Sequence, residues 1–122
     1  MENKSVNTFL RLHALYYLVT GIWALVSLST FTLAVGDFHT GNEYEVHTIS
    51  AAALALGVVF ILASRYHKPN REIVLTASLV ALAVASVEIA YLPSRGWSLH
   101  WLNVVENVFA AGYFGYYSSR LF

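Results

Sequence analysis

Two acidic side chains, Glu88 and Glu106, stand within long apolar stretches of the chain. A carboxylate at membrane depth costs several kcal/mol unless it is paired, neutralised or hydrated, so an acid in such a stretch indicates a functional site. Two carboxyls that face each other from neighbouring helices can share a proton or hold the polar group of a ligand. We therefore predict that Glu88 and Glu106 converge within the lipid bilayer.

Asparagines accompany the second glutamate at helical spacing. Asn103, Glu106 and Asn107 are related by i, i+3 and i+4, so they share one helix face. From a helical rise of about 1.5 Å per residue, Glu88 is expected roughly 6 Å and Glu106 roughly 12 Å below the outer membrane surface. These residues predict a polar pocket in the outer half of the membrane, above an apolar floor. The expected ligand-binding residues are Glu88, Asn103, Glu106, Asn107, Ser27, Thr30, Ser50 and Trp23.

A structural role remains open for both acids. Glu88 lies one turn from the predicted end of its helix, where it can extend to the interface or pair with Arg95 in the adjoining loop. Glu106 lies deeper and has no cation near it in sequence, so its structural role would be a neutral or asparagine-bonded carboxyl that joins two helices.

The histidines do not predict a metal or haem site. His39, Glu43 and His47 would align on a helix, but Gly41 argues against a continuous helix there. His13 and His47 are expected at opposite ends of their spans, which excludes a bis-histidine haem pair between them. We interpret His13 as an interfacial or packing residue near the cytoplasmic end of the first span. We expect no metal ion and no cofactor.

Four stretches of the sequence have the length and composition of membrane spans. Helices need about 20 predominantly apolar residues to cross the hydrocarbon core, and each stretch approaches or exceeds that length. The spans are expected at about 11–35, 46–65, 72–92 and 98–119, within a single domain of residues 1–122. Short connections make successive spans antiparallel. The prediction is an all-α, up-down-up-down four-helix transmembrane bundle that contacts the lipid bilayer.

The basic residues predict the orientation of the bundle. Six of the seven fall on one side of a four-span arrangement, and only Arg95 falls on the other. The six are Lys4, Arg11, Arg65, Lys68, Arg71 and Arg120. Because basic loops stay on the cytoplasmic side, both termini are expected there.

Small residues predict the faces on which the helices touch. Ala77, Ala81 and Ala85 recur every four positions, and Gly57 and Gly115 each follow an alanine at the same spacing. Such rows allow close approach of helix backbones in lipid. The first row leads toward Glu88, which places that acid on an interior face.

Composition excludes several classes of function. Charged residues make up 11% of the chain and apolar residues 57%. An ordinary soluble domain carries about 25% charged residues, so the charge content is low. The net charge is zero, so no basic field indicates nucleic-acid binding. The absence of cysteine excludes disulfides and thiol chemistry. No hydrolase, zinc-protease or phosphate-loop motif is present, and an enzymatic role is not expected.

The opening motif L-x-x-L-Y-Y-L-V-T-G-I-W contains Tyr17, Thr20, Gly21 and Trp23, and acids follow in the last two spans. In these features the chain resembles the small four-span bacterial proteins grouped as DoxX-like. The resemblance implies a four-helix integral membrane fold in the bacterial inner (plasma) membrane. Some members are associated with quinone-linked oxidation or redox complexes, which makes a quinone one candidate ligand.

Three functions are compatible with these observations. The first is a ligand-binding or accessory membrane protein whose outer-half pocket takes a small amphiphile. The second is a structural subunit of a larger membrane complex. The third is a proton-linked carrier or channel component that acts as a homo-oligomer, with Glu106 as the protonatable group. The absence of inverted repeats and broken helices argues against an independent transporter.

Overall fold

The computed structural model describes residues 2–35, 43–66, 68–90 and 99–120. Within these ranges the secondary structure is entirely helical, which confirms the predicted all-α class. The helices are α1 (Glu2–Val26), α2 (Leu28–Val35), α3 (Glu43–Ala63), α4 (Arg71–Ala90) and α5 (Leu99–Ser118). Asn70 caps α4, because its Oδ1 accepts hydrogen bonds from the backbone N–H groups of Glu72 and Ile73.

Three helices in the described ranges are long and apolar enough to cross a membrane. They contain the segments Lys4–Val26, Val46–Ala63 and Arg71–Ala90. The α5 helix has 20 residues but falls outside this group. Its first half carries Asn103, Glu106 and Asn107, which lower its apolar character.

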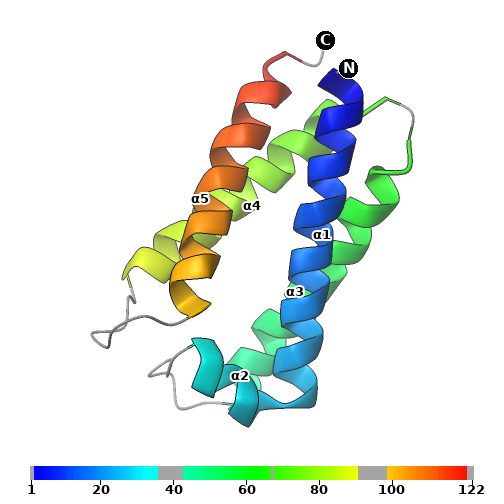
Figure 1. Ribbon diagram of the computed structural model, residues 1–122. Helices are drawn as coiled ribbons and strands as arrows, with labels where there is room; N and C mark the ends of the chain where they lie inside the picture. The colour runs from blue at the N-terminus through cyan, green and yellow to red at the C-terminus, as the bar shows by residue number, and fades with distance from the viewer. Residues whose placement is uncertain (1, 36–42, 67, 91–98, 121–122) are drawn as a thin grey trace.

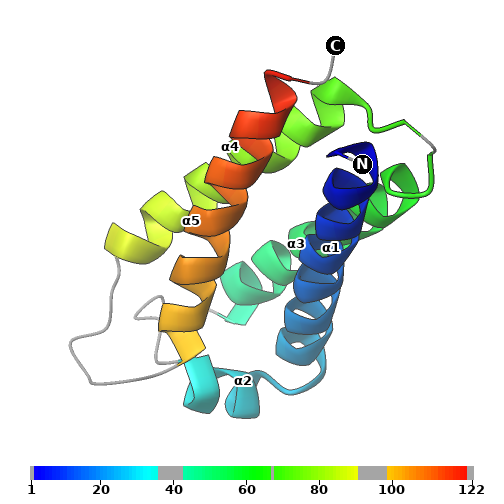
Figure 2. The same cartoon turned by 45° about the horizontal axis from the view of Figure 1, so that its top comes forward.

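The helices form two antiparallel pairs. α1 packs along α3, and α4 packs along α5, whereas contacts between the pairs are sparse. Figures 1 and 2 show the two pairs side by side, with the N-terminal end of α1 and the C-terminal end of α5 at the same end of the molecule. The space between α1 and α5 is therefore the place where groups from different pairs can meet.

Small residues bring α1 and α3 together. A Cβ atom added at Gly57 would lie 2.8 Å from Cγ of Leu18 and 3.1 Å from the carbonyl oxygen of Ala14. At Gly21 an added Cβ would lie 2.9 Å from the carbonyl oxygen of Ser50. These glycines permit backbone contacts that any side chain would prevent.

The α4–α5 pair uses the predicted alanine row. Ala77, Ala81 and Ala85 are buried, in agreement with the spacing argument. Beside them, Ser78 Oγ donates a 2.7 Å hydrogen bond to the carbonyl oxygen of Ala111. A hydroxyl bond from one helix to the backbone of its neighbour requires such close approach, and it adds direction to apolar packing.

Aromatic side chains join the two pairs. The ring of Phe9 on α1 lies 5.2 Å from the rings of Phe109 and Phe114 and 4.4 Å from that of Tyr113, measured between centroids. Large side chains keep the α1 and α5 backbones apart, which explains why contacts between the pairs are few at the level of the backbone. The interface leaves room between helices for polar side chains.

The first predicted span differs from the observed helices. Instead of one helix over 11–35, α1 begins at Glu2 and ends at Val26, and α2 begins after a break at Ser27. Thr30 Oγ1 donates to the Ser27 carbonyl oxygen at 3.1 Å and lies 2.7 Å from Ser27 Oγ. Hydroxyl groups that compete for backbone carbonyls favour bends of this kind. The chain turns at this point, and α2 lies across the end of the bundle (Figure 1).

Candidate functional site

The candidate site is a group of polar side chains between the two helix pairs. α1 provides His13 and Tyr17, whose i, i+4 spacing places them on one face. α5 provides Glu106 and Asn107, and α4 provides Glu88 near its end at Ala90. Three helices therefore contribute to one site.

His13 and Glu106 form the central contact. Nδ1 of the His13 imidazole pairs with Oε1 of the Glu106 carboxyl across the gap between α1 and α5. The His13 side chain is completely buried, and that of Glu106 is 18% exposed. A buried imidazole that faces a carboxyl satisfies the requirement that an acid in an apolar protein be paired.

Aromatic rings hold the imidazole in place. The His13 ring lies 4.4 Å from the ring of Tyr17, 5.5 Å from that of Phe114 and 6.0 Å from that of Phe60, all between centroids. Because these rings come from α1, α5 and α3, the imidazole has little freedom to rotate away from Glu106. The pair is thus oriented by its surroundings.

Asn107 connects the remaining polar groups. Its Oδ1 accepts a 2.9 Å hydrogen bond from the hydroxyl of Tyr17, and its Nδ2 donates to Oε1 of Glu88 at 3.0 Å. The same nitrogen donates to the backbone carbonyl of Asn103 at 2.9 Å. Asn107 is 2% exposed, so its amide joins α1, α4 and α5 in a nearly dry environment.

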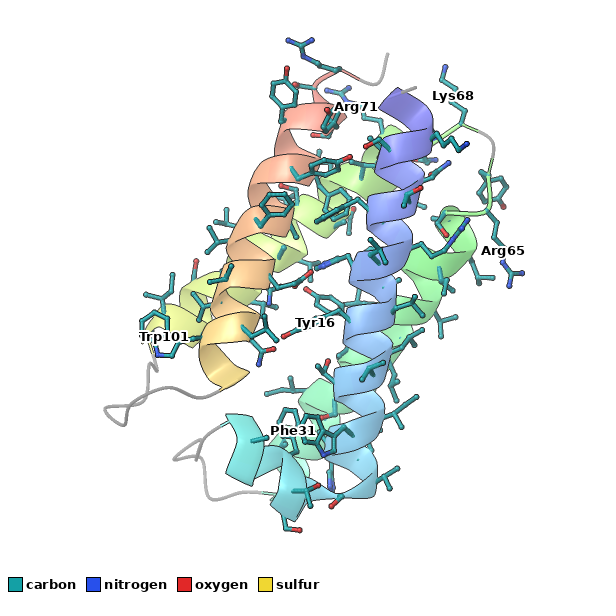
Figure 3. The ribbon with its side chains drawn as sticks, in the orientation of Figure 1. Tyr16, Phe31, Arg65, Lys68, Arg71 and Trp101 are labelled. Carbon is teal, nitrogen blue, oxygen red and sulfur yellow. The ribbon has the colours of Figure 1, made fainter. Side chains whose placement is uncertain are left out.

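The two carboxyls lie on α4 and α5 within the same site. Glu88 and Glu106 lie within range of each other's charge, and Tyr16, which lies within range of both, extends from α1 toward α5 (Figure 3). Glu88 and Glu106 are half-buried, whereas His13, Tyr17 and Asn107 are buried. The site therefore has a buried layer that orients a more accessible pair of acids.

Buried atoms of the site that lack a hydrogen-bond partner among the described residues include Nε2 of His13 and Oε2 of Glu106. Buried polar atoms nearly always have a partner, and exceptions indicate water, an ion or a ligand. The His13–Glu106 pair thus retains hydrogen-bonding capacity that the protein leaves unused.

The residues predicted from the sequence separate into three places. Glu88, Glu106 and Asn107 lie at the site described above, and Asn103 contributes its backbone carbonyl. The other four lie elsewhere. Trp23 Nε1 donates a 2.9 Å hydrogen bond to Thr30 Oγ1, beside Ser27. Ser50 Oγ donates a 2.8 Å hydrogen bond to the carbonyl oxygen of Val46. Their polar groups are therefore bonded within the α1–α2 corner and within α3. Arg95, a suggested partner of Glu88, lies outside the described residues.

Sequence reasoning missed His13 and Tyr17 as members of the site. The first span was expected to start near Arg11, which placed His13 at the membrane surface. In the structure α1 starts at Glu2. At a rise of about 1.5 Å per residue, His13 therefore lies about 16 Å along the helix. The sequence signal that could have identified these two residues is a histidine within a membrane span with a tyrosine four positions later.

No group of three or more His, Asp or Glu side chains in the described ranges could hold a metal ion. His39 lies outside those ranges, so the suggested His39–Glu43–His47 alignment is not described.

Comparison of the chain with protein-family models, with curated proteins and with solved structures found no match. The resemblance to DoxX-like proteins therefore stays a prediction from the sequence.

Proposed function

We propose that the chain is a four-span integral membrane protein with both termini in the cytoplasm. α1, α3 and α4 contain the three apolar segments, and α5, antiparallel to α4 and equally long, is the fourth span. Lys68 and Arg71 lie at the end of the molecule where both termini lie, and Arg65 lies lower, just past the end of α3 (Figure 3). The rule that basic residues remain inside supports the cytoplasmic assignment, and a bacterial inner membrane agrees with the resemblance noted above.

The function that the site supports best is binding of a small amphiphile between the two helix pairs. One observation carries this proposal: the buried His13–Glu106 pair leaves Nε2 and Oε2 without hydrogen-bond partners among the described residues. A ligand with a polar head and an apolar body would complete these bonds while it remains in a lipid-like environment. This proposal moves the site from the outer half toward the middle of the membrane, because His13 lies in it.

The chemistry of the acids limits the head group. An ionised carboxyl only accepts hydrogen bonds, so a head that reaches Glu106 Oε2 must be a donor. Hydroxyl, phenol and amine groups qualify. A quinol also meets this requirement through its hydroxyls, whereas an oxidised quinone, which only accepts, would need a protonated carboxyl.

Replacement of Glu106 by Gln tests the proposal. The probes are an alkyl alcohol, an alkylphenol and an alkylamine of equal chain length, with binding measured by calorimetry on the purified protein in detergent. We expect E106Q to bind the preferred probe at least about tenfold more weakly, since a charged hydrogen bond contributes about 1.5–3 kcal/mol. Glu72→Gln is the matched control, because Glu72 is exposed in the first turn of α4 and lies outside the site.

The outcomes separate the two principal functions. Unchanged binding by E106Q, or no binding of any probe by the intact protein, would contradict the ligand proposal. If E106Q folds less stably and no probe binds, the network is a structural connection between the helix pairs. The observation that favours this alternative is that Asn107 joins three helices by itself. A structural protein of this kind would act as a subunit of a larger membrane complex.

A further inference from the structure

A second feature of the molecule is a groove between α1 and α5, on the side of the basic end. It has a volume of about 680 Å³ and is open to the surface. Because the groove is largely open, it can cover one side of a bound molecule but does not enclose it. The lining residues are Lys4, Ser5, Thr8, Phe9, Leu12 and Tyr113.

The chemistry of the groove changes along α1. Lys4, Ser5 and Thr8 stand in the first turns of the helix, and Phe9 and Leu12 follow. At a rise of about 1.5 Å per residue, Leu12 lies about 12 Å farther along the axis than Lys4. The groove therefore has a cationic, hydroxyl-bearing end near the membrane surface and an apolar part at the depth of acyl chains.

Lys4 differs from Arg11 and Arg71 at this end. Its side chain is exposed and makes no hydrogen bond or ion pair with the described residues. By contrast, Arg11 Nη2 donates to the Ser64 carbonyl oxygen at 3.4 Å, and Arg71 Nε donates to the Ser118 carbonyl oxygen at 3.2 Å. The positive charge at the rim of the groove is thus available to an anion.

One wall of the groove is fixed by contacts across the two helices. Ser5 Oγ and the Tyr113 hydroxyl form a 2.7 Å hydrogen bond, and the rings of Phe9 and Tyr113 are 4.4 Å apart. These contacts hold α1 and α5 at the distance that leaves the groove between them. The groove is consequently a preformed feature, which reduces the entropic cost of binding.

We propose that this groove binds one anionic phospholipid. The phosphate lies against the Lys4 ammonium, and an acyl chain follows Phe9 and Leu12 beside the Tyr113 ring. Charge complementarity favours an anionic over a zwitterionic head group, as in other basic recesses between membrane helices on the cytoplasmic side. The inference rests on the proposed placement in a membrane but not on the polar site at Glu106.

Native mass spectrometry of the detergent-solubilised protein tests this inference. The probes are phosphatidylglycerol and phosphatidylcholine with identical acyl chains. We expect the intact protein to bind phosphatidylglycerol about fivefold more tightly, the effect of about one basic residue near a membrane surface. Lys4→Gln should remove this preference. Lys68→Gln is the matched control, because Lys68 is exposed at the same end but does not line the groove.

A second variant examines the apolar part of the groove. Leu12 is 58% exposed, so Leu12→Trp can be accommodated by the fold and should fill the space along α1. It is expected to weaken binding of both lipids without a change in their ratio. If K4Q keeps the preference, or K68Q removes it equally, the inference is overturned. E106Q should retain the lipid preference, which separates this test from that of the proposed function.

Discussion

The imidazole of His13 on α1 pairs with the carboxyl of Glu106 on α5, and this contact joins two helix pairs that also meet through aromatic rings and through hydrogen bonds of Tyr17 and Ser5. Within each pair, backbones approach closely at small residues. Between the pairs, the separation is wider and the contacts are polar or aromatic. The polar site and the looser interface are therefore consequences of the same arrangement.

Replacement of His13 by Leu should destabilise the protein by about 1–3 kcal/mol, because a buried carboxyl would lose its partner. E106Q should be milder than H13L, since the amide can still accept a hydrogen bond from the imidazole. Unfolding in graded detergent mixtures, followed by circular dichroism, measures both effects. Equal stability of H13L and the intact protein would show that the pair contributes nothing to the interface between the helix pairs.

Tyr17→Phe removes one hydroxyl without a change in ring size. The variant loses the hydrogen bond from that hydroxyl to Asn107 Oδ1. This loss should cost about 0.5–1.5 kcal/mol in the same assay. Tyr116→Phe is the control, because Tyr116 is 52% exposed and its loss of a hydroxyl should have little effect. A larger effect at Tyr116 than at Tyr17 would contradict the role of Asn107 as a connection between helices.

Asn107→Leu preserves approximate side-chain volume but removes three hydrogen bonds, to Tyr17, Glu88 and the Asn103 backbone. We expect a greater loss of stability than for Y17F, by about 1–2 kcal/mol, since buried polar groups on two other helices then lose this partner. The two variants are compared by the same unfolding measurement. A gain in stability would indicate that the amide is retained for function rather than for folding.

Much of the fold could be predicted from local patterns. Apolar length predicted the helices, and the spacing of Ala77, Ala81 and Ala85 predicted the buried face of α4. Helical periodicity also placed Asn103, Glu106 and Asn107 on one face. These inferences concern one helix at a time, and short-range spacing is sufficient for them.

The contacts between distant helices could not be predicted in the same way. The pairing of His13 with Glu106 depends on where α1 begins and on which helices become neighbours, neither of which follows from spacing alone. The break at Ser27 could not be predicted either. Whether a hydroxyl competes for a backbone carbonyl depends on local geometry, which the spacing of residues does not give. The corner formed there directs Trp23 and Thr30 away from the predicted pocket and toward each other.

Two glycines offer a direct test of how the helices pack. A Cβ at Gly57 would lie 2.8 Å from Leu18 Cγ and 3.1 Å from the Ala14 carbonyl oxygen, whereas a Cβ at Gly112 would meet no heavy atom within 4 Å. Gly57→Ala should therefore cost about 1–3 kcal/mol through overpacking. Gly112→Ala should be neutral or stabilising by up to about 1 kcal/mol, because alanine favours the helix.

The same unfolding assay compares the two glycine variants, and the order of their stabilities is the result that matters. Both substitutions add one methyl group within a helix, so helix propensity affects them in the same direction. Of the two, Gly57 is the one that faces the backbone of a neighbouring helix. If G57A is at least as stable as G112A, α1 and α3 do not approach as closely as the contact at Ala14 requires. The two-pair arrangement that positions His13 opposite Glu106 would then have to be revised.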